Sequence, residues 1–295
     1  MSTPVRGQAA FRTYLEMIKF EHSIFALPFA MIGMMWGSLQ IGLSSWPGFR
    51  VFGLIVVAMV SCRSAAMAFN RIVDRSIDAL NPRTSMRALP AGLLQLRQAN
   101  LFLIGSIVLF FGAAALLNPL AFALSPVALF VTLGYSLTKR FTPLCHIVLG
   151  LSLGIAPAAA WIAVTGKLHP AILPVVLGVL CWTAGFDIIY SLQDDEFDSA
   201  QGLRSIPQTF GRTKALLISR TLHVVAIFSL VVGGSLVGAG IPYMLGVGLA
   251  GALLTYEQSL VKPDDLSRVD MAFFTLNGFV SIGVFAFALV DVLTR

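Results

Sequence analysis

Long apolar runs dominate this chain of 295 residues, and short polar stretches separate them. A helix needs about 20 apolar residues to cross the hydrocarbon core of a membrane. By this criterion the pattern predicts nine membrane-spanning helices and an all-α polytopic membrane protein. The approximate spans are 23–43, 51–70, 100–118, 120–138, 144–164, 170–190, 215–237, 241–256 and 270–293.

The composition agrees with this prediction, because 57% of the residues are hydrophobic and only 12% are charged. No low-complexity tract or polar linker divides the chain, so residues 1–295 are expected to form a single transmembrane domain. Ahead of the first span, apolar residues recur at helical spacing opposite charged ones, which predicts an interfacial helix within residues 1–22. The apolar positions are Phe11, Tyr14, Leu15 and Ile18.

The net charge of +6 follows from where the basic residues lie. A cytoplasmic N-terminus and nine spans place the connections near 71–99, 139–143, 191–214 and 257–269 on the cytoplasmic side. Of the 20 Lys and Arg residues, 16 lie in these connections, in the N-terminal segment or at adjoining helix ends. This asymmetry follows the positive-inside rule. The basic excess is therefore a topology signal and requires no nucleic-acid partner.

Two of these loops concentrate oxygen-bearing side chains at helical spacing. In the first, Asn70, Asp74 and Asp78 are four residues apart, and each step of four returns to within about 40° of the same helix face. In the second, the corresponding positions are Asp187, Tyr190, Asp194 and Asp198. The two Asp-x-x-x-Asp pairs are 120 residues apart, which indicates two similar halves followed by a ninth helix.

Carboxylates stacked on one face repel each other at low dielectric unless a cation neutralises them. Oxygen ligands favour a hard cation, Mg²⁺ first, and Mg²⁺ commonly completes its shell with substrate phosphate. Basic residues that could bind phosphate oxygens lie in the same loops or at helix ends. They are Arg83, Arg87, Lys139, Arg140 and Arg204. This combination predicts a lipid diphosphate as ligand, with its hydrocarbon tail in the apolar interior.

A simpler interpretation is a solvated rim, in which Asp74 pairs with Arg75 and Asp78 with Arg83. It explains one such loop more easily than two loops with the same spacing. Arg63 is a separate anomaly, because it lies inside a span, seven residues before Asn70. It either pairs or reaches toward the interface, or it binds an anion such as the carboxylate of a second substrate.

Together these residues resemble the UbiA family of intramembrane aromatic prenyltransferases. The resemblance covers the whole chain and is specific as a joint pattern. Its parts are N-x-x-x-D-x-x-x-D at 70–78, the following NPRTSMRALPAG, YSLTKRFT at 135–142, D-x-x-Y-x-x-x-D-x-x-x-D at 187–198 and the GLRS turn.

The resemblance implies nine helices around a central cavity, capped by the loops near 71–99 and 191–214. It also implies that two Mg²⁺ ions hold a polyprenyl diphosphate through Asn70, Asp74, Asp78, Asp194 and Asp198. The diphosphate would contact Arg83, Arg87, Lys139 and Arg204, with Tyr135 and Tyr190 nearby. Arg63 would face the carboxylate of an aromatic acid, and Asp187 is a candidate for the base that removes the ring proton or for orienting the phenol.

The implied reaction is Mg²⁺-dependent prenylation of an aromatic acid ortho to its hydroxyl group, in quinone biosynthesis at a bacterial inner membrane. The acceptor stays open between 4-hydroxybenzoate and 1,4-dihydroxy-6-naphthoate of the futalosine route to menaquinone. The opening IKFEHSIFALPFA differs from the L-D-x-P-I-G start of many 4-hydroxybenzoate enzymes, and Arg71 replaces an Asp common in the family. These departures resemble a sister branch that includes enzymes acting on the naphthoate.

Three alternative functions are less favoured by the sequence. A CDP-alcohol phosphotransferase would need a D-G-x-x-A-R segment, which the chain lacks. A secondary transporter would place its acids within the spans, whereas these acids lie at helix ends. A family member with a haem or phosphosugar acceptor is the nearest rival, although four scattered histidines do not favour a haem site.

Overall fold

The computed structural model describes residues 13–14, 17–18 and 25–295, and these are almost entirely helical. The long helices are α2 (Leu27–Gln40), α3 (Phe49–Val73), α5 (Leu96–Leu117), α6 (Pro119–Thr138), α7 (Cys145–Thr165), α8 (Leu173–Ser191), α11 (Arg212–Leu236), α12 (Ile241–Leu260) and α13 (Asn277–Leu293). Shorter helical segments are α4 (Arg75–Leu80), η2 (Pro170–Ile172), η3 (Leu192–Asp194), α9 (Asp195–Ala200), α10 (Ile206–Phe210) and the π-helical turn η4 (Met271–Leu276).

Within the described residues, seven helical segments are long and apolar enough to cross a membrane. They comprise α3, α5, α6, α7, α11 and the segments 170–200 and 271–293, which contain α8 and α13. The other two long helices are α2, with 14 described residues, and α12, which carries Glu257 and Gln258 near its end. The all-α membrane class is confirmed, while the count of nine spans stays a prediction. The interfacial helix expected in residues 1–22 falls largely outside the described residues.

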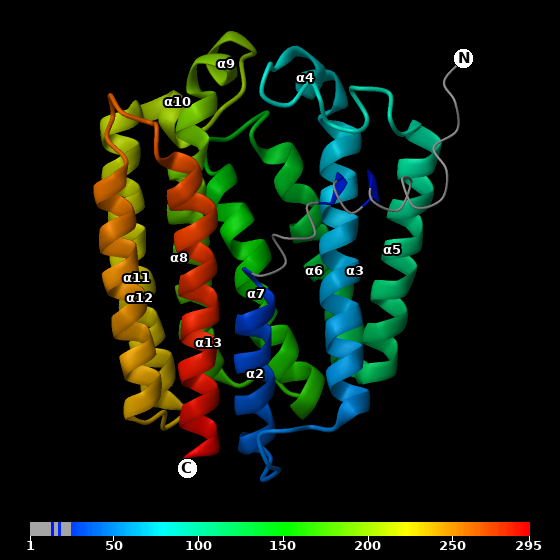
Figure 1. Ribbon diagram of the computed structural model, residues 1–295. Coiled ribbons are helices and arrows are strands. Elements are labelled where there is room, and N and C mark those ends of the chain that lie inside the picture. The colour runs from blue at the N-terminus through cyan, green and yellow to red at the C-terminus, as the bar shows by residue number, and fades with distance from the viewer. Residues whose placement is uncertain (1–12, 15–16, 19–24) are drawn as a thin grey trace.

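The long helices run side by side in alternating directions (Figure 1). The connections after α3, α6, α8 and α12 all lie at one end, uppermost in Figure 1, together with α4, α9 and α10. These are the four connections expected to share one side of the membrane. The C-terminus lies at the opposite end.

Helix α7 is packed closely because small residues face its neighbours. A Cβ atom at Gly33 of α2 would lie 2.0 Å from the carbonyl oxygen of Pro157 in α7. A Cβ atom at Gly150 of α7 would lie 2.3 Å from the carbonyl oxygen of Leu180 in α8. Such glycines let helix backbones approach within a membrane. Helix α7 is therefore packed tightly against both α2 and α8.

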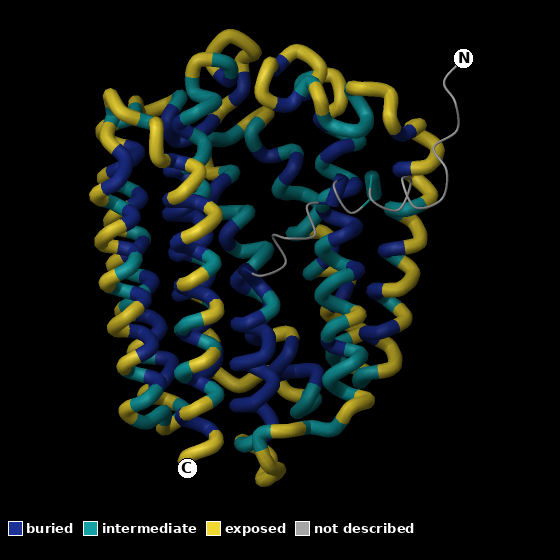
Figure 2. The backbone as a smooth tube through the Cα atoms, in the orientation of Figure 1, coloured by how far each residue is buried: buried dark blue, intermediate teal, exposed yellow. Residues whose placement is uncertain are grey.

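Exposed residues lie mainly on the outside of the bundle, and buried residues lie mainly between the helices (Figure 2). The exposed positions include large apolar residues, such as Phe130 of α6 and Val224 and Phe228 of α11, with exposed fractions of 78%, 70% and 69%. Apolar surface of this kind is stable against lipid tails. The exterior therefore fits a bilayer.

Candidate active site

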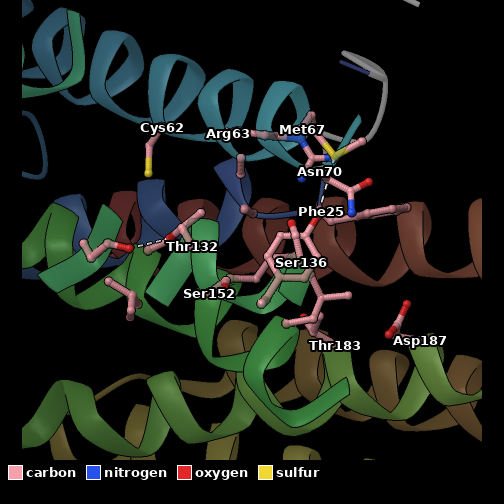
Figure 3. Close-up of a pocket in the computed structure, with 18 of the residues that line it drawn as sticks. Phe25, Cys62, Arg63, Met67, Asn70, Thr132, Ser136, Ser152, Thr183 and Asp187 are labelled. Carbon is pink, nitrogen blue, oxygen red and sulfur yellow. Dashed lines mark hydrogen bonds between the residues drawn. The ribbon is translucent and has the colours of Figure 1, made fainter. Parts of the chain in front are cut away.

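A cavity of about 640 Å³ lies inside the bundle. Its walls come mainly from α3, α5, α6, α7, α8 and η4. Figure 3 shows Arg63, Met67 and Asn70 reaching into it from α3, and Thr183 and Asp187 from α8. At its apolar end the cavity reaches Leu124 and Val127 of α6, whose side chains are exposed, so this end meets the outer surface of the bundle.

The first acidic cluster spans a junction between two helices. Helix α3 ends at Val73 and α4 begins at Arg75, so Asp74 stands between them. The helical hydrogen bonds nevertheless continue across the junction, because the Asp74 amide donates to the Asn70 carbonyl (3.0 Å) and the Asp78 amide donates to the Asp74 carbonyl (2.7 Å). The Asn70 side chain also donates to the Asp74 carboxylate (2.9 Å). All three oxygen-bearing side chains line the cavity, as their spacing predicts.

Both carboxylates of this cluster are buried and paired with arginine. Arg140 contacts Asp74 (Nη2 to Oδ1, 2.9 Å), and Arg87 contacts Asp78 (Nη1 to Oδ1, 2.7 Å). The rim pairings with Arg75 and Arg83 are therefore not the ones formed. Oδ2 of Asp78 is buried and has no hydrogen-bond partner in the described part of the chain. A buried carboxylate oxygen without a partner is costly, and it is an available ligand atom.

The second cluster is held by Arg83, which reaches it from the loop after α4. Its guanidinium group donates two hydrogen bonds to the Asp194 carboxylate, one of them at 3.0 Å, and one to the Tyr190 hydroxyl at 2.8 Å. The same group lies 4.9 Å from the centre of the Tyr190 ring. Partial burial lowers the pKa of Arg83, but its hydrogen bonds to Asp194 and the negative charge there outweigh this and raise the pKa above its ordinary value. The two loops are thus joined across one end of the cavity.

The helix that carries the second cluster is also interrupted. Helix α8 ends at Ser191, η3 follows, and α9 begins at Asp195. Asp194 and Asp198 still line the cavity together with Asp187. Asn81 adds a link that the sequence pattern did not reveal, because its side chain donates to Asp194 (3.1 Å).

Asp187 has a partner that the sequence did not indicate. One of its carboxylate oxygens, Oδ2, lies 2.7 Å from Nδ1 of His146, at the start of α7. The backbone amide of Ile206 donates to Nε2 of the same ring (3.4 Å). An isolated histidine has no local spacing pattern, so only the tertiary structure identifies it as part of the site.

Deeper in the cavity, Arg63 extends from α3 with no ion pair to any described residue. Its Nε atom is buried and has no hydrogen-bond partner among them. The hydroxyl oxygens of Ser136 and Thr183, which also line the cavity, are buried and unpartnered in the same sense. A guanidinium group and two hydroxyl groups that line the same cavity without partners of their own suit a polar ligand. Tyr135 lines the same region, and its hydroxyl lies 4.0 Å from the Met67 sulfur.

The expected basic residues are not all at the cavity. Arg83, Arg87 and Lys139 line it, and Arg140 stands behind Asp74. Arg204 does not line it, because its side chain donates to the Phe141 carbonyl (2.9 Å) and thereby braces the connection between α6 and α7. The structure thus gives Arg204 a supporting position, and its contact with a diphosphate stays a prediction.

The oxygen donors fit a cation that is shared with a ligand. Within the described residues, no three His, Cys, Asp or Glu side chains converge as a ready metal-binding group. Asn70, Asp74, Asp78, Asp194 and Asp198 instead line one cavity, and Asp78 has a free buried oxygen. This donor set suits Mg²⁺, which takes few protein ligands and completes its shell with water and phosphate.

Comparison with known proteins decides the family. The sequence model of the UbiA prenyltransferase family matches residues 27–280. The chain belongs to this family. A UbiA homologue of Aeropyrum pernix K1, solved in its apo form, has a TM-score of 0.82 and 35% identity, covering 92% of this chain and 98% of that one. The expected UbiA-type fold and the prenyl-transferring class of enzyme are confirmed.

Further UbiA relatives resemble the chain over nearly its full length. The 4-hydroxybenzoate octaprenyltransferase of Saccharophagus degradans is 30% identical over 284 residues, which are 96% of this chain and 94% of that protein. A UbiA homologue of Archaeoglobus fulgidus bound to DMAPP and Mg²⁺ has a TM-score of 0.71 at 19% identity, covering 96% of this chain and 100% of that one. The second similarity shows the shared UbiA fold alone.

Proposed function

We propose that this protein transfers a polyprenyl chain from polyprenyl diphosphate to the ring carbon ortho to the hydroxyl group of 4-hydroxybenzoate, in a Mg²⁺-dependent reaction of quinone biosynthesis. The observation that carries the proposal is a cavity with three buried or half-buried carboxylates, each paired with an arginine, at one end and apolar walls at the other. A lipid diphosphate has the same division between a charged head and an apolar tail.

The pairing explains how one set of residues can serve both a metal and an anion. Without ligand, Arg83, Arg87 and Arg140 neutralise the carboxylates. A magnesium diphosphate carries both charges, so with that ligand bound the carboxylates would face the metal and the arginines would face the phosphate oxygens. Asn70, Asp74, Asp78, Asp194 and Asp198 would hold the metal, as two ions. When bound, magnesium supplies positive charge against the departing diphosphate.

The placement of the remaining groups supports the following course of the reaction. The allylic C–O bond breaks, and the diphosphate leaves with the electron pair and is held by the arginines and Lys139. A π-electron pair of the phenol ring forms the new C–C bond, and the ring carbon then loses its proton to restore aromaticity. Asp187 lines the cavity and is the proposed acceptor of that proton. The apolar walls exclude water that would otherwise trap the carbocation.

Arg63 supports an aromatic carboxylate as the second substrate. Its guanidinium group faces the cavity without an ion pair to a described residue, at a depth between the acidic clusters and the apolar end. A carboxylate there would form a charge-assisted hydrogen bond. The name of the relative from Saccharophagus degradans favours 4-hydroxybenzoate over 1,4-dihydroxy-6-naphthoate. The distribution of basic residues supports an orientation in which the charged end of the cavity faces the cytoplasm. The membrane proposed is a bacterial inner membrane, in line with the bacterial relative.

The test is product formation by the purified full-length chain in lipid with polyprenyl diphosphate, 4-hydroxybenzoate and Mg²⁺. We expect EDTA to abolish the product and excess Mg²⁺ to restore it. Asp74→Asn should lose activity, whereas Asp264→Asn should retain it, because Asp264 is exposed in the connection after α12 and does not line the cavity. Equal rates for Asp74→Asn and wild type would contradict the metal role.

The acceptor is tested by competition. Wild type receives 4-hydroxybenzoate and 1,4-dihydroxy-6-naphthoate together, and mass spectrometry identifies the products. A dominant prenylated hydroxybenzoate supports the proposal, and a dominant naphthoate product reassigns the acceptor. Arg63→Met should raise KM for either acid and leave KM for the diphosphate nearly unchanged, because the lost group would bind only the carboxylate.

A further inference from the structure

His146 lies where three parts of the cavity wall meet. The ring belongs to α7, its Nδ1 atom contacts the Asp187 carboxylate of α8 (2.7 Å), and its Nε2 atom accepts from the Ile206 amide at the start of α10 (3.4 Å). The His146 side chain is 4% exposed, so neither nitrogen depends on bulk water for its partner. Both His146 and Asp187 line the cavity.

These two contacts fix the position of the imidazole proton. A backbone N–H can only donate, so the nitrogen that faces Ile206 must carry the lone pair. The ring proton is therefore on Nδ1, where it donates to the Asp187 carboxylate. A carboxylate that accepts this hydrogen bond is stabilised in its ionised form and fixed in orientation.

The Asp187 carboxylate has one further oxygen. Oδ2 is the atom bound to His146, and Oδ1 makes no hydrogen bond to any described residue. The Asp187 side chain is 21% exposed, and it borders the cavity. Its second oxygen is therefore available to a ligand in this space.

We propose that His146 is a positioning residue for the prenyl transfer. As the neutral Nδ1–H tautomer it keeps Asp187 ionised and directs the free carboxylate oxygen toward the aromatic acceptor. This inference rests on the proposed function, because it deepens the role given there to Asp187. His146 itself neither gains nor loses a proton during the reaction.

The step it supports is balanced without any further reagent. The prenyl C–O bond breaks with its electron pair on the diphosphate, and the ring forms the C–C bond with a π pair. The proton on that ring carbon passes to Oδ1 of Asp187 as aromaticity returns, and Asp187 later releases it to water. The Ile206 amide also ties the imidazole to the segment that follows Asp198.

The tautomer is tested without turnover. Nitrogen-15 NMR of the full chain labelled at histidine, in lipid bilayers, resolves protonated and unprotonated ring nitrogens, and the loss of one signal pair in His146→Gln assigns it. We expect one protonated and one unprotonated nitrogen, with the protonated atom identified as Nδ1 by its coupling to the ring carbons. A ring protonated at Nε2 alone, or at both nitrogens, overturns the proposal.

The coupling to the reaction is tested with paired variants. His146→Leu removes both hydrogen bonds and should lower kcat by about 10- to 100-fold, with KM for polyprenyl diphosphate within about twofold of wild type. His146→Gln keeps one N–H donor and one C=O acceptor and should recover most of kcat. His169→Gln, an exposed histidine at the opposite end of α7, is the matched control and should leave kcat unchanged.

A double-mutant cycle separates positioning from a general structural role. In the Asp187→Asn background, His146→Leu should cause no further loss of kcat, since its effect passes through the carboxylate. Equal fold losses in both backgrounds, or a Gln variant as impaired as the Leu variant, overturn the proposal. If wild type forms no prenylated acid at all, the proposed function fails, while the NMR result still decides the state of the His146–Asp187 pair.

Discussion

Two groups of polar side chains lie within the helical bundle, and their surroundings differ. The mouth cluster consists of seven residues that border the cavity, together with Arg140, which stands behind Asp74. The seven are Asn70, Asp74, Asp78, Arg83, Arg87, Tyr190 and Asp194. The interhelical cluster is packed between α8, α11, α12 and α13 and consists of Trp182, Ser219, His223, Glu257, Gln258 and Asn277. No residue of the interhelical cluster lines the cavity.

The clusters also differ in charge compensation. Each carboxylate of the mouth cluster is paired with an arginine. Glu257 is fully buried beside Asn277, and it forms no ion pair with a described residue. The neighbouring groups are joined by neutral hydrogen bonds, such as Trp182 Nε1 to Asn277 (2.6 Å) and Gln258 Nε2 to Ser219 (2.7 Å). Paired charges of both signs beside a cavity indicate ligand chemistry, whereas polar groups packed between helices, with no ion pair to a described residue, indicate helix association.

The largest expected effect is at the mouth cluster. Asp78→Asn removes a carboxylate whose free oxygen is proposed to bind the metal, and it leaves Arg87 unpaired. We expect the rate of prenyl transfer to fall by at least about 100-fold at saturating substrate. A rate within a few fold of wild type, measured by product mass at several Mg²⁺ concentrations, would remove Asp78 from the metal site.

Arg83 is expected to give the next largest effect. Arg83→Met removes a cation that the proposal assigns to the diphosphate, so KM for that substrate should rise about 10- to 100-fold. Because the pKa of Arg83 is raised, the group stays cationic wherever the chain is folded, and wild-type KM should show no pH dependence from it. Arg83→Lys is the matched variant. Its KM for the diphosphate should lie between those of wild type and Arg83→Met, since an ammonium group keeps the charge but cannot form the paired hydrogen bonds. An unchanged KM in Arg83→Met would show that the pair with Asp194 is only structural.

Tyr190→Phe tests a smaller contribution at the same place. The substitution removes the hydroxyl that accepts from Arg83 and keeps the ring, which stacks on Phe273 with centroids 4.1 Å apart. We expect kcat/KM for the diphosphate to fall by about two- to tenfold, which corresponds to one lost hydrogen bond. A loss as large as that of Asp78→Asn would mean that the hydroxyl contacts the reacting atoms.

The smallest effect is expected in the interhelical cluster. Glu257→Gln keeps the shape of a fully buried side chain and removes the possibility of a buried charge. We expect kcat/KM to stay within about twofold of wild type and Tm to remain equal or rise. Both are measured on the same purified preparation, by product mass and by thermal unfolding. A large loss of activity with an unchanged Tm would give Glu257 a role in the reaction and would remove the contrast between the clusters.

The parts of the site that were predictable are those set by local periodicity. Asn70, Asp74 and Asp78 line the cavity together because their spacing matches the helical repeat, and the junction at Asp74 does not interrupt the hydrogen bonds. The end of the bundle that carries the charged loops was predictable from the apolar runs and the basic residues between them. The transmembrane helices follow from the same patterning.

The parts that were not predictable depend on contacts between distant segments. The Arg83 side chain pairs with Asp194, which is 111 residues away in the sequence, and not with Asp78, which is five residues away. His146 meets Asp187 only because α7 and α8 pack closely through Gly150. Arg204 donates to the carbonyl of Phe141, which is 63 residues away, a contact that the sequence did not indicate. The spacing of residues along the chain does not predict which distant side chains come into contact.

The cavity opens to the outer surface at Leu124 and Val127. This opening affects how the length of a substrate's hydrocarbon tail is recognised. Both side chains border the interior and are also exposed on a lipid-facing helix. We therefore expect the hydrocarbon tail of the proposed substrate to continue past the wall into the surrounding bilayer, where no closed end limits its length. On this proposal the charged head is recognised and the number of isoprene units is not, so the supply of isoprenoid diphosphates would determine the length of the product.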